Sequence, residues 1–106
     1  MNYEEDIRIY GEVVKDTELS PFETIEALHI RSELHEKYSN LTWEEKRALL
    51  LYDLKILGNA DKMVKHIQQV YDFSKSTNPI QEWWWHLDKI ITGKIHLSYL
   101  VEEKNS

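Results

Sequence analysis

The amino-acid sequence predicts an all-α protein: a single-domain bundle of four or five helices with short connectors, in which most successive helices are antiparallel neighbours. Three observations support this fold class. The 106 residues include only three glycines and two prolines, which favours long helices over turn-rich strands. Two segments begin with N-terminal helix-capping motifs. Apolar residues also recur at helical spacing along most of the chain.

This periodicity and the capping motifs predict five helices. They are expected at residues 3–15, 21–38, 43–57, 60–75 and 79–103. Residues 3–15 also fit a short extended arm, because Gly11 weakens a helix at this place. The second and third helices have the clearest starts, since Ser20 and Thr42 each precede a glutamate at the third helical position.

The third predicted helix has apolar residues on two opposed sides. One group is Trp43, Leu50, Leu54 and Leu57, and the opposite group is Leu49, Tyr52 and Ile56. A helix with two apolar faces packs between other helices or between subunits. We therefore expect the third helix to be central in the bundle or at an interface.

The last predicted helix, residues 79–103, carries three consecutive tryptophans and most of the expected core contacts. Trp83 and Trp84 fall on its apolar stripe, whereas Trp85 points roughly 100° away from Trp84. The side that includes Trp85 is a candidate protein-binding surface, unless residues 3–14 fold over it or the helix is buried all round. This candidate surface is made of Trp85, Lys89, Thr92, His96 and Tyr99.

Charge and composition limit the classes of function. The net charge is −6, and residues 1–42 hold ten acidic and four basic residues. An acidic chain disfavours broad binding to nucleic-acid phosphates and favours a basic protein partner. The absence of cysteine, the acidic first residues and the lack of a long apolar run predict a cytoplasmic protein with no membrane segment.

Two alternatives involve other ligands. Residues 50–69 resemble a helix-turn-helix hairpin of DNA-binding regulators, although Leu54 is bulky for a helix crossing. The residues that would contact DNA are Lys62, Lys65, His66 and Gln69. A weak metal or small-ligand site on the second helix would use Glu26, His29 and Glu33, which share the Glu-x-x-His spacing of di-iron bundles but lack a second copy of it.

No pattern of an enzyme or of a cofactor site is found. The chain has no cysteine nucleophile, no serine in a glycine-rich elbow and no glycine-rich phosphate loop, and its five histidines are scattered singly. The leading hypothesis is therefore a small acidic protein–protein interaction module, such as an adaptor, assembly factor or inhibitor. We expect it to associate with itself as a homodimer, because one small bundle has few places to bury every apolar face.

Overall fold

The computed structural model describes residues 3–15 and 19–94. Within these residues the chain forms five α-helices and three 3-10 turns. The α-helices are α1 (Glu4–Val14), α2 (Pro21–Glu36), α3 (Trp43–Gly58), α4 (Ala60–Ile67) and α5 (Leu87–Ile91). The 3-10 turns are η1 (Tyr38–Asn40), η2 (Phe73–Lys75) and η3 (Trp83–Trp85). The predicted all-α bundle is confirmed.

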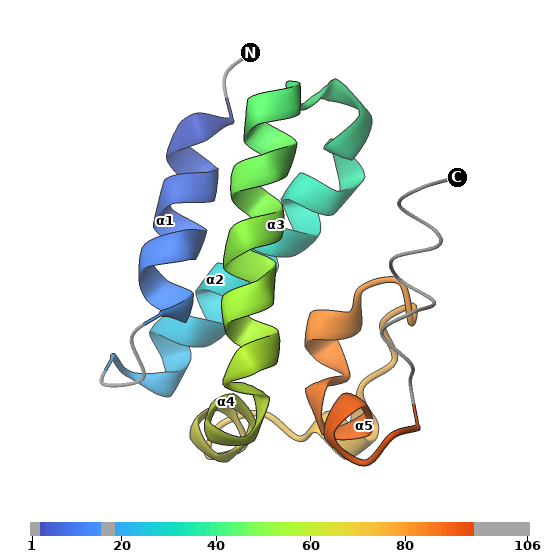
Figure 1. Ribbon diagram of the computed structural model, residues 1–106. Helices are drawn as coiled ribbons and strands as arrows, with labels where there is room; N and C mark the ends of the chain where they lie inside the picture. The colour runs from blue at the N-terminus through green and yellow to red at the C-terminus, as the bar shows by residue number, and fades with distance from the viewer. Residues whose placement is uncertain (1–2, 16–18, 95–106) are drawn as a thin grey trace.

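The first three helices form one half of the molecule. α1 and α3 lie side by side, α2 lies behind them in the opposite direction, and α4 crosses their lower end (Figure 1). The segment containing η3 and α5 lies beside the lower part of α3 and packs on α4. Among the helices of the described ranges, none has the length and apolar character needed to cross a membrane.

The starts of α2 and α3 follow the predicted capping motifs. The Ser20 hydroxyl accepts a hydrogen bond from the Glu23 N–H at 3.3 Å, and the Glu23 carboxylate accepts one from the Ser20 N–H. Thr42 and Glu45 make the same reciprocal pair, at 3.1 and 2.8 Å. Because these bonds satisfy backbone donors that have no partner inside the helix, both starts are determined locally.

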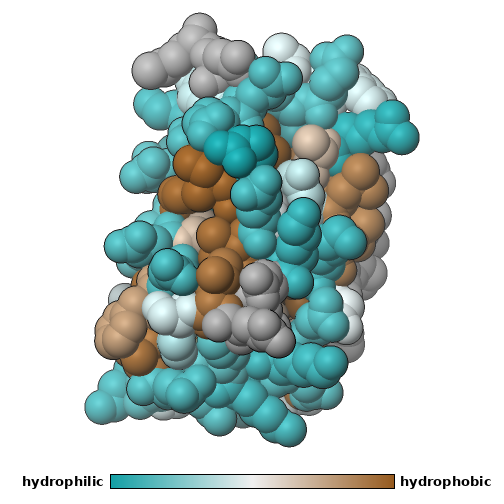
Figure 2. Space-filling view, turned by 90° about the vertical axis from the view of Figure 1, so that its left-hand side faces the viewer, coloured by the Kyte–Doolittle hydropathy of each residue, from teal (hydrophilic) through white to brown (hydrophobic). Residues whose placement is uncertain are grey.

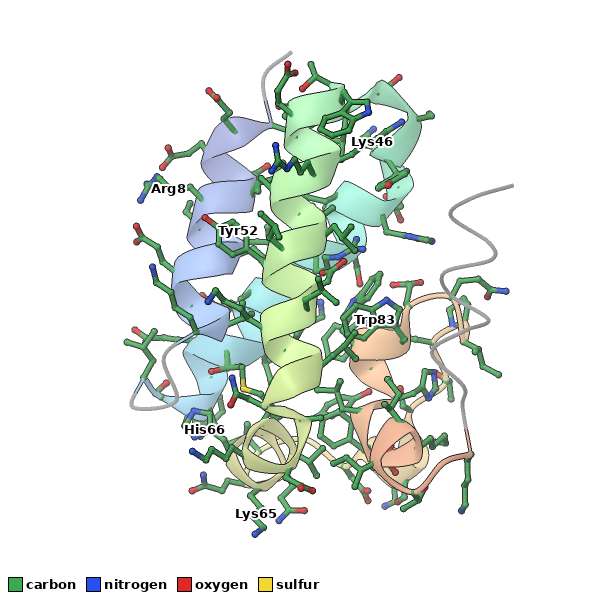
Figure 3. The ribbon with its side chains drawn as sticks, viewed as in Figure 1. Arg8, Lys46, Tyr52, Lys65, His66 and Trp83 are labelled. Carbon is green, nitrogen blue, oxygen red and sulfur yellow. The ribbon has the colours of Figure 1, made fainter. Side chains whose placement is uncertain are left out.

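Residues 4–14 are helical, so the helix rather than the extended arm is confirmed for the start of the chain. Gly11 lies in the middle of α1, where the ring of Tyr52 from α3 packs on it (Figure 3). A Cβ atom at Gly11 would lie 2.4 Å from carbon atoms of that ring. The glycine therefore allows α1 and α3 to approach closely.

The core contains apolar side chains from every α-helix. Its buried members are Ile7, Tyr10, Val14, Ala27, Leu28, Leu34, Leu41, Leu49, Ile56, Met63, Ile67, Phe73, Trp83, Trp84, Trp85 and Leu87. Seen from the α1 side, the surface is mostly hydrophilic, with a narrow strip of apolar side chains (Figure 2). On α1, Ile9 and Val13 are half-buried.

The fourth helix is shorter than predicted and ends at Ile67 instead of residue 75. The carbonyl of Ile67 accepts hydrogen bonds from the N–H groups of both Val70 and Tyr71, which closes the helix. The Tyr71 ring then contacts the rings of Phe73 and Trp85, with centroids 5.2 and 5.3 Å away. Tertiary ring packing replaces the last two turns of the predicted helix.

The predicted long helix at residues 79–103 is wrong over its described part. Glu82 N–H bonds to the Pro79 carbonyl, and the i→i+3 bonds of η3 follow before the short α5 begins at Leu87. Gly93 has a φ of 78°, a left-handed conformation that ends the helical path and suits glycine. Residues 95–103 of the predicted helix lie outside the described residues.

Candidate functional site

The structure places the predicted anchor Trp85 in the interior rather than on the surface. Its side chain is 2% exposed, and its ring contacts His29 of α2 and Tyr71 at centroid distances of 4.9 and 5.3 Å. The sequence left open whether Trp85 is exposed or buried, and the structure buries it. The prediction assumed a continuous helix, which would direct Trp84 and Trp85 to different sides, whereas η3 buries both.

The other residues of that predicted surface do not form a cluster with Trp85. Lys89 is half-buried, and its Nζ donates a hydrogen bond to the Phe73 carbonyl at 3.3 Å. Thr92 is exposed, and its hydroxyl bonds back to carbonyls of its own helical turn. His96 and Tyr99 lie outside the described residues.

Ser32 of α2 holds the tryptophan segment, although no pattern in the sequence marks this residue. Its hydroxyl oxygen accepts hydrogen bonds from the indole N–H groups of Trp84 and Trp85, at 2.9 and 2.8 Å. The same hydroxyl donates to the Glu82 carboxylate at 2.7 Å. A hydroxyl has one hydrogen and two acceptor sites, so Ser32 is fully used. It explains why two consecutive indoles face the same helix.

A buried charged pair, which was not among the residues predicted from the sequence, joins α2 to α3. Arg31 Nε and Nη2 donate to the two carboxylate oxygens of Asp53, at 2.9 and 3.0 Å, and both side chains are at most 2% exposed. The Tyr10 hydroxyl donates to the same carboxylate at 2.7 Å. The Arg31 guanidinium carbon lies 4.2 Å from the centre of the Trp84 ring, a cation–π contact.

The environment of this pair shifts two pKa values. Burial, reinforced by the negative charge of Asp53, raises the pKa of Tyr10 well above its usual value. For Arg31, burial alone lowers the pKa, but the adjacent Asp53 carboxylate outweighs burial and raises it. A sequence signal existed: Arg31 and Asp53 are opposite charges on the buried stripes of two helices.

The predicted metal or small-ligand residues do not converge. Glu26, His29 and Glu33 are exposed on α2, and the imidazole of His29 lies against the Trp85 ring. Across residues 3–15 and 19–94, no group of three or more histidine, aspartate or glutamate side chains could hold a metal ion. The alternative of a metal site at these three residues is therefore not supported, because the required second set of ligands is not near them.

The helix-turn-helix alternative depends on α3 and α4, which are joined by Asn59 alone. Lys62 and Lys65 are exposed, and Lys65 points away from the bundle (Figure 3). His66 is half-buried, and Gln69 lies beyond the end of α4, where its side chain bonds to the His66 carbonyl at 3.0 Å. The four residues predicted to contact DNA are thus not all presented on one helix.

The most exposed apolar surface of the described chain lies along α3. One side of this helix buries Leu49 and Ile56, as the sequence predicted for one of its two apolar groups. On the other side, a stripe of large apolar side chains faces solvent. The exposed fractions are 71% for Trp43, 44% for Leu50, 52% for Leu51 and 53% for Leu54. We call these four residues the α3 stripe.

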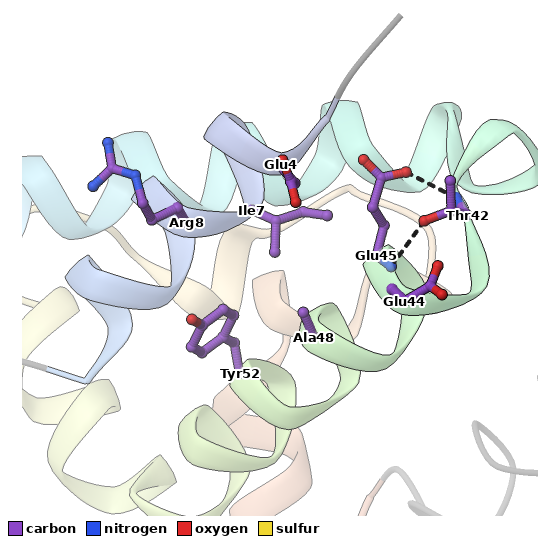
Figure 4. Close-up of a pocket in the computed structure, with 8 residues that line it drawn as sticks. All are labelled: Glu4, Ile7, Arg8, Thr42, Glu44, Glu45, Ala48 and Tyr52. Carbon is purple, nitrogen blue, oxygen red and sulfur yellow. Dashed lines mark hydrogen bonds between the residues drawn. The ribbon is translucent and has the colours of Figure 1, made fainter.

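A first groove lies between α1 and the start of α3 and has a volume of about 550 Å³ (Figure 4). It is lined by Glu4, Ile7, Arg8, Thr42, Glu44, Glu45, Ala48 and Tyr52. The Glu45 carboxylate accepts bonds from the Thr42 and Tyr3 N–H groups at 2.8 and 3.0 Å, and these bonds lower its pKa. Arg8 pairs with Glu5 and Glu12. Glu45 and Arg8 therefore serve local structure.

A second groove, of about 450 Å³, lies at the opposite end of α3. It is lined by Leu57, Gly58, Asn59, Ala60, Asp61, Lys62, Ile90 and Ile91. Gly58 contributes no side chain, and a Cβ atom added there would meet nothing within 4 Å. Ile91 on its rim is 41% exposed. We call this the Gly58 groove.

Comparison with known proteins adds no functional information. The chain matches no protein family, and neither the curated proteins nor the solved structures contain a significant match to it.

Proposed function

We propose that this chain is a protein–protein interaction module that binds through the solvent-facing side of α3. The observation that supports this proposal is the α3 stripe, in which an exposed tryptophan and three leucines share one face of a single helix. Contiguous exposed apolar patches on small proteins mark binding surfaces more often than chance, and tryptophan is enriched among residues that dominate binding energy.

The arrangement of polar groups supports the same proposal. The buried pair Arg31 and Asp53, the Ser32 hydroxyl and the Glu45 carboxylate all have structural partners inside the fold. On the solvent side of α3, the large apolar side chains lie with three charged ones, Glu44, Arg47 and Lys55. The Arg47 guanidinium carbon is 6.0 Å from the centre of the Trp43 ring. Such a face suits the packing of another helix, as in an adaptor, assembly factor or inhibitor.

Four acidic residues occupy a different surface, on α2, although Glu44 is exposed on α3 itself. Glu23, Glu26, Glu33 and Glu36 are exposed on α2. A basic partner would be attracted toward α2, whereas the α3 stripe supplies the apolar contact, so the two surfaces have separable roles. The absence of cysteine suits a reducing compartment, and we expect the module to act in the cytoplasm.

The test compares affinity capture from a host extract by the wild type, by Leu54→Glu and by a matched control, Phe22→Glu. Leu54 is 53% and Phe22 67% exposed, so both variants are expected to fold, and circular dichroism checks this. The proposal is supported if a partner is retained by the wild type and the control but lost with Leu54→Glu. The purified partner must then also bind Leu54→Glu at least about tenfold more weakly than it binds the wild type. If every partner, including a second copy of the chain, binds Leu54→Glu as well as wild type, the proposal fails.

A further inference from the structure

We propose that the α3 stripe binds a second copy of this chain, with the two α3 helices antiparallel about a twofold axis. In this arrangement Trp43 of each copy enters the Gly58 groove of the other. This inference rests on the proposed function of the α3 face and names its partner.

The two ends of α3 have complementary shapes. At the N-terminal end, Trp43 is the first residue of the helix and is 71% exposed. At the C-terminal end, Gly58 leaves a groove with apolar side chains from Leu57, Ile90 and Ile91. Asn59, Asp61 and Lys62 line the same groove. One chain therefore carries both a large apolar projection and a partly apolar groove that a tryptophan can enter.

The positions of these two features select an antiparallel pair. Trp43 and Gly58 are 15 residues apart, which is roughly 22 Å along an α-helix. A twofold axis through the midpoint, between Leu50 and Leu51, brings each Trp43 to the Gly58 of the second copy and forms both contacts at once. A parallel pair would instead place the two Trp43 side chains against each other and leave both grooves unfilled.

The residues between the two ends fit the same arrangement. Leu50 and Leu51, exposed by 44% and 52%, lie nearest the axis. Arg47 lies opposite Leu54 of the second copy, where its aliphatic stem covers the leucine while the guanidinium reaches solvent. The exposed apolar residues of α3 thus form a seam that includes the stem of Arg47, with Glu44 and Lys55 along one edge.

Charge and size predict how strong the pair is. Each copy has a net charge of −6, so the two copies repel at long range, and added salt is expected to strengthen the pair by screening. The interface would consist of one helix face from each copy and the two Gly58 grooves, so its buried area lies at the lower end of the range for protein interfaces. We therefore expect a monomer–dimer equilibrium at micromolar concentrations.

Sedimentation of the full chain tests the interface. The wild type is expected to shift from monomer to dimer with concentration, and more so at higher salt. Trp43→Ala, which removes the projection, and Gly58→Gln, which occupies the groove, are each expected to weaken the dimer at least about tenfold, equal to about 1.4 kcal/mol. Phe22→Ala, on α2, is the control and should not change it. Thermal unfolding of dilute samples verifies that each monomer stays folded.

Disulfide trapping tests the orientation, because the chain has no cysteine of its own. The variants Arg47→Cys and Leu54→Cys carry different tags and are mixed under mild oxidation. An antiparallel pair gives mostly the mixed disulfide, whereas a parallel pair gives mostly disulfides between identical variants and contradicts the proposed geometry. Phe22→Cys measures the background of random collisions.

Failure of this inference is distinguishable from failure of the proposed function. A wild type that stays monomeric at every concentration and salt removes the second copy as the partner. If Leu54→Glu still loses a purified partner in that case, the interaction proposal holds with a different protein. If Leu54→Glu instead lowers the stability of a strict monomer, Leu54 contributes to the fold of the monomer itself and both proposals fail.

Discussion

Arg31 and Asp53 form a two-point ion pair in the centre of the bundle, with N–O distances of 2.9 and 3.0 Å and at most 2% exposure of either side chain. The pair joins the middle of α2 to the middle of α3. Tyr10 of α1 donates to the same carboxylate, so three helices meet at one polar point. Among the described residues, Arg31 Nη1 has no hydrogen-bond partner, and the cation instead lies on the Trp84 ring.

Breaking this ion pair on one side should be strongly destabilising. Arg31→Met leaves the Asp53 carboxylate buried without its counter-charge, and the expected loss in the free energy of unfolding is about 3–5 kcal/mol. The triple variant Arg31→Met, Asp53→Leu, Tyr10→Phe removes the two charges and the phenol hydroxyl together and should recover most of that loss. Urea denaturation measures both. A triple variant as unstable as Arg31→Met alone would show that the polar contacts, rather than an isolated charge, dominate.

Tyr10 should make the stability depend on alkaline pH. Burial, with the nearby Asp53 charge, raises the pKa of Tyr10 in the folded protein, so the folded state holds the phenolic proton more tightly than the unfolded state. The stability is complete below the unfolded pKa of about 10 and falls as pH rises above it, by up to about 1.4 kcal/mol per pH unit. The free energy of unfolding is measured for the wild type and Tyr10→Phe from about pH 8 upward, and the difference between the two proteins isolates the contribution of Tyr10. Parallel curves for the two proteins would contradict it.

Ser32→Ala should destabilise the tryptophan segment. The substitution removes the acceptor of two buried indole N–H groups, and each unsatisfied donor costs about 1–3 kcal/mol. Thermal unfolding measures the total, with the exposed Ser39→Ala as the control. Ser32→Thr keeps the hydroxyl and should lose less. A loss below about 0.5 kcal/mol for Ser32→Ala, the range of ordinary surface changes, would contradict the role given to this hydroxyl.

Gly11→Ala should have an effect whose sign depends on Tyr52. In the wild type the added Cβ would lie 2.4 Å from ring atoms of Tyr52, so the ring must shift, at an expected cost of about 1–3 kcal/mol. In a Tyr52→Ala background the space is open, and the same change should stabilise α1 by about 0.5–1 kcal/mol through helix propensity. A double-mutant cycle by urea denaturation reports the coupling. Equal effects in both backgrounds would exclude the close contact.

The starts of α2 and α3 could be predicted from the sequence because their causes are local. The capping pairs Ser20–Glu23 and Thr42–Glu45 form within one helical turn, and no distant residue is needed for them. The two apolar sides of α3 were also predictable from spacing. The sequence could not predict which side would be buried. That depends on where α1 and α2 pack and on the ion pair between Asp53 and Arg31 in the interior.

The path of residues 79–94 was decided by tertiary structure. Spacing predicted a long helix that directs Trp84 and Trp85 to different sides. Instead, the N–H groups of Trp84 and Trp85 both bond to the hydroxyl oxygen of Ser32, which lies 52 and 53 residues earlier in the chain. Periodicity assumes that a helix continues and contains no information about such a distant acceptor. The Gly58 groove has the same origin, since α5 completes it. Thus the sequence by itself determined the helical class and the two apolar sides of α3. Only long-range hydrogen bonding and packing decided which of those sides, and which tryptophan, remains on the surface.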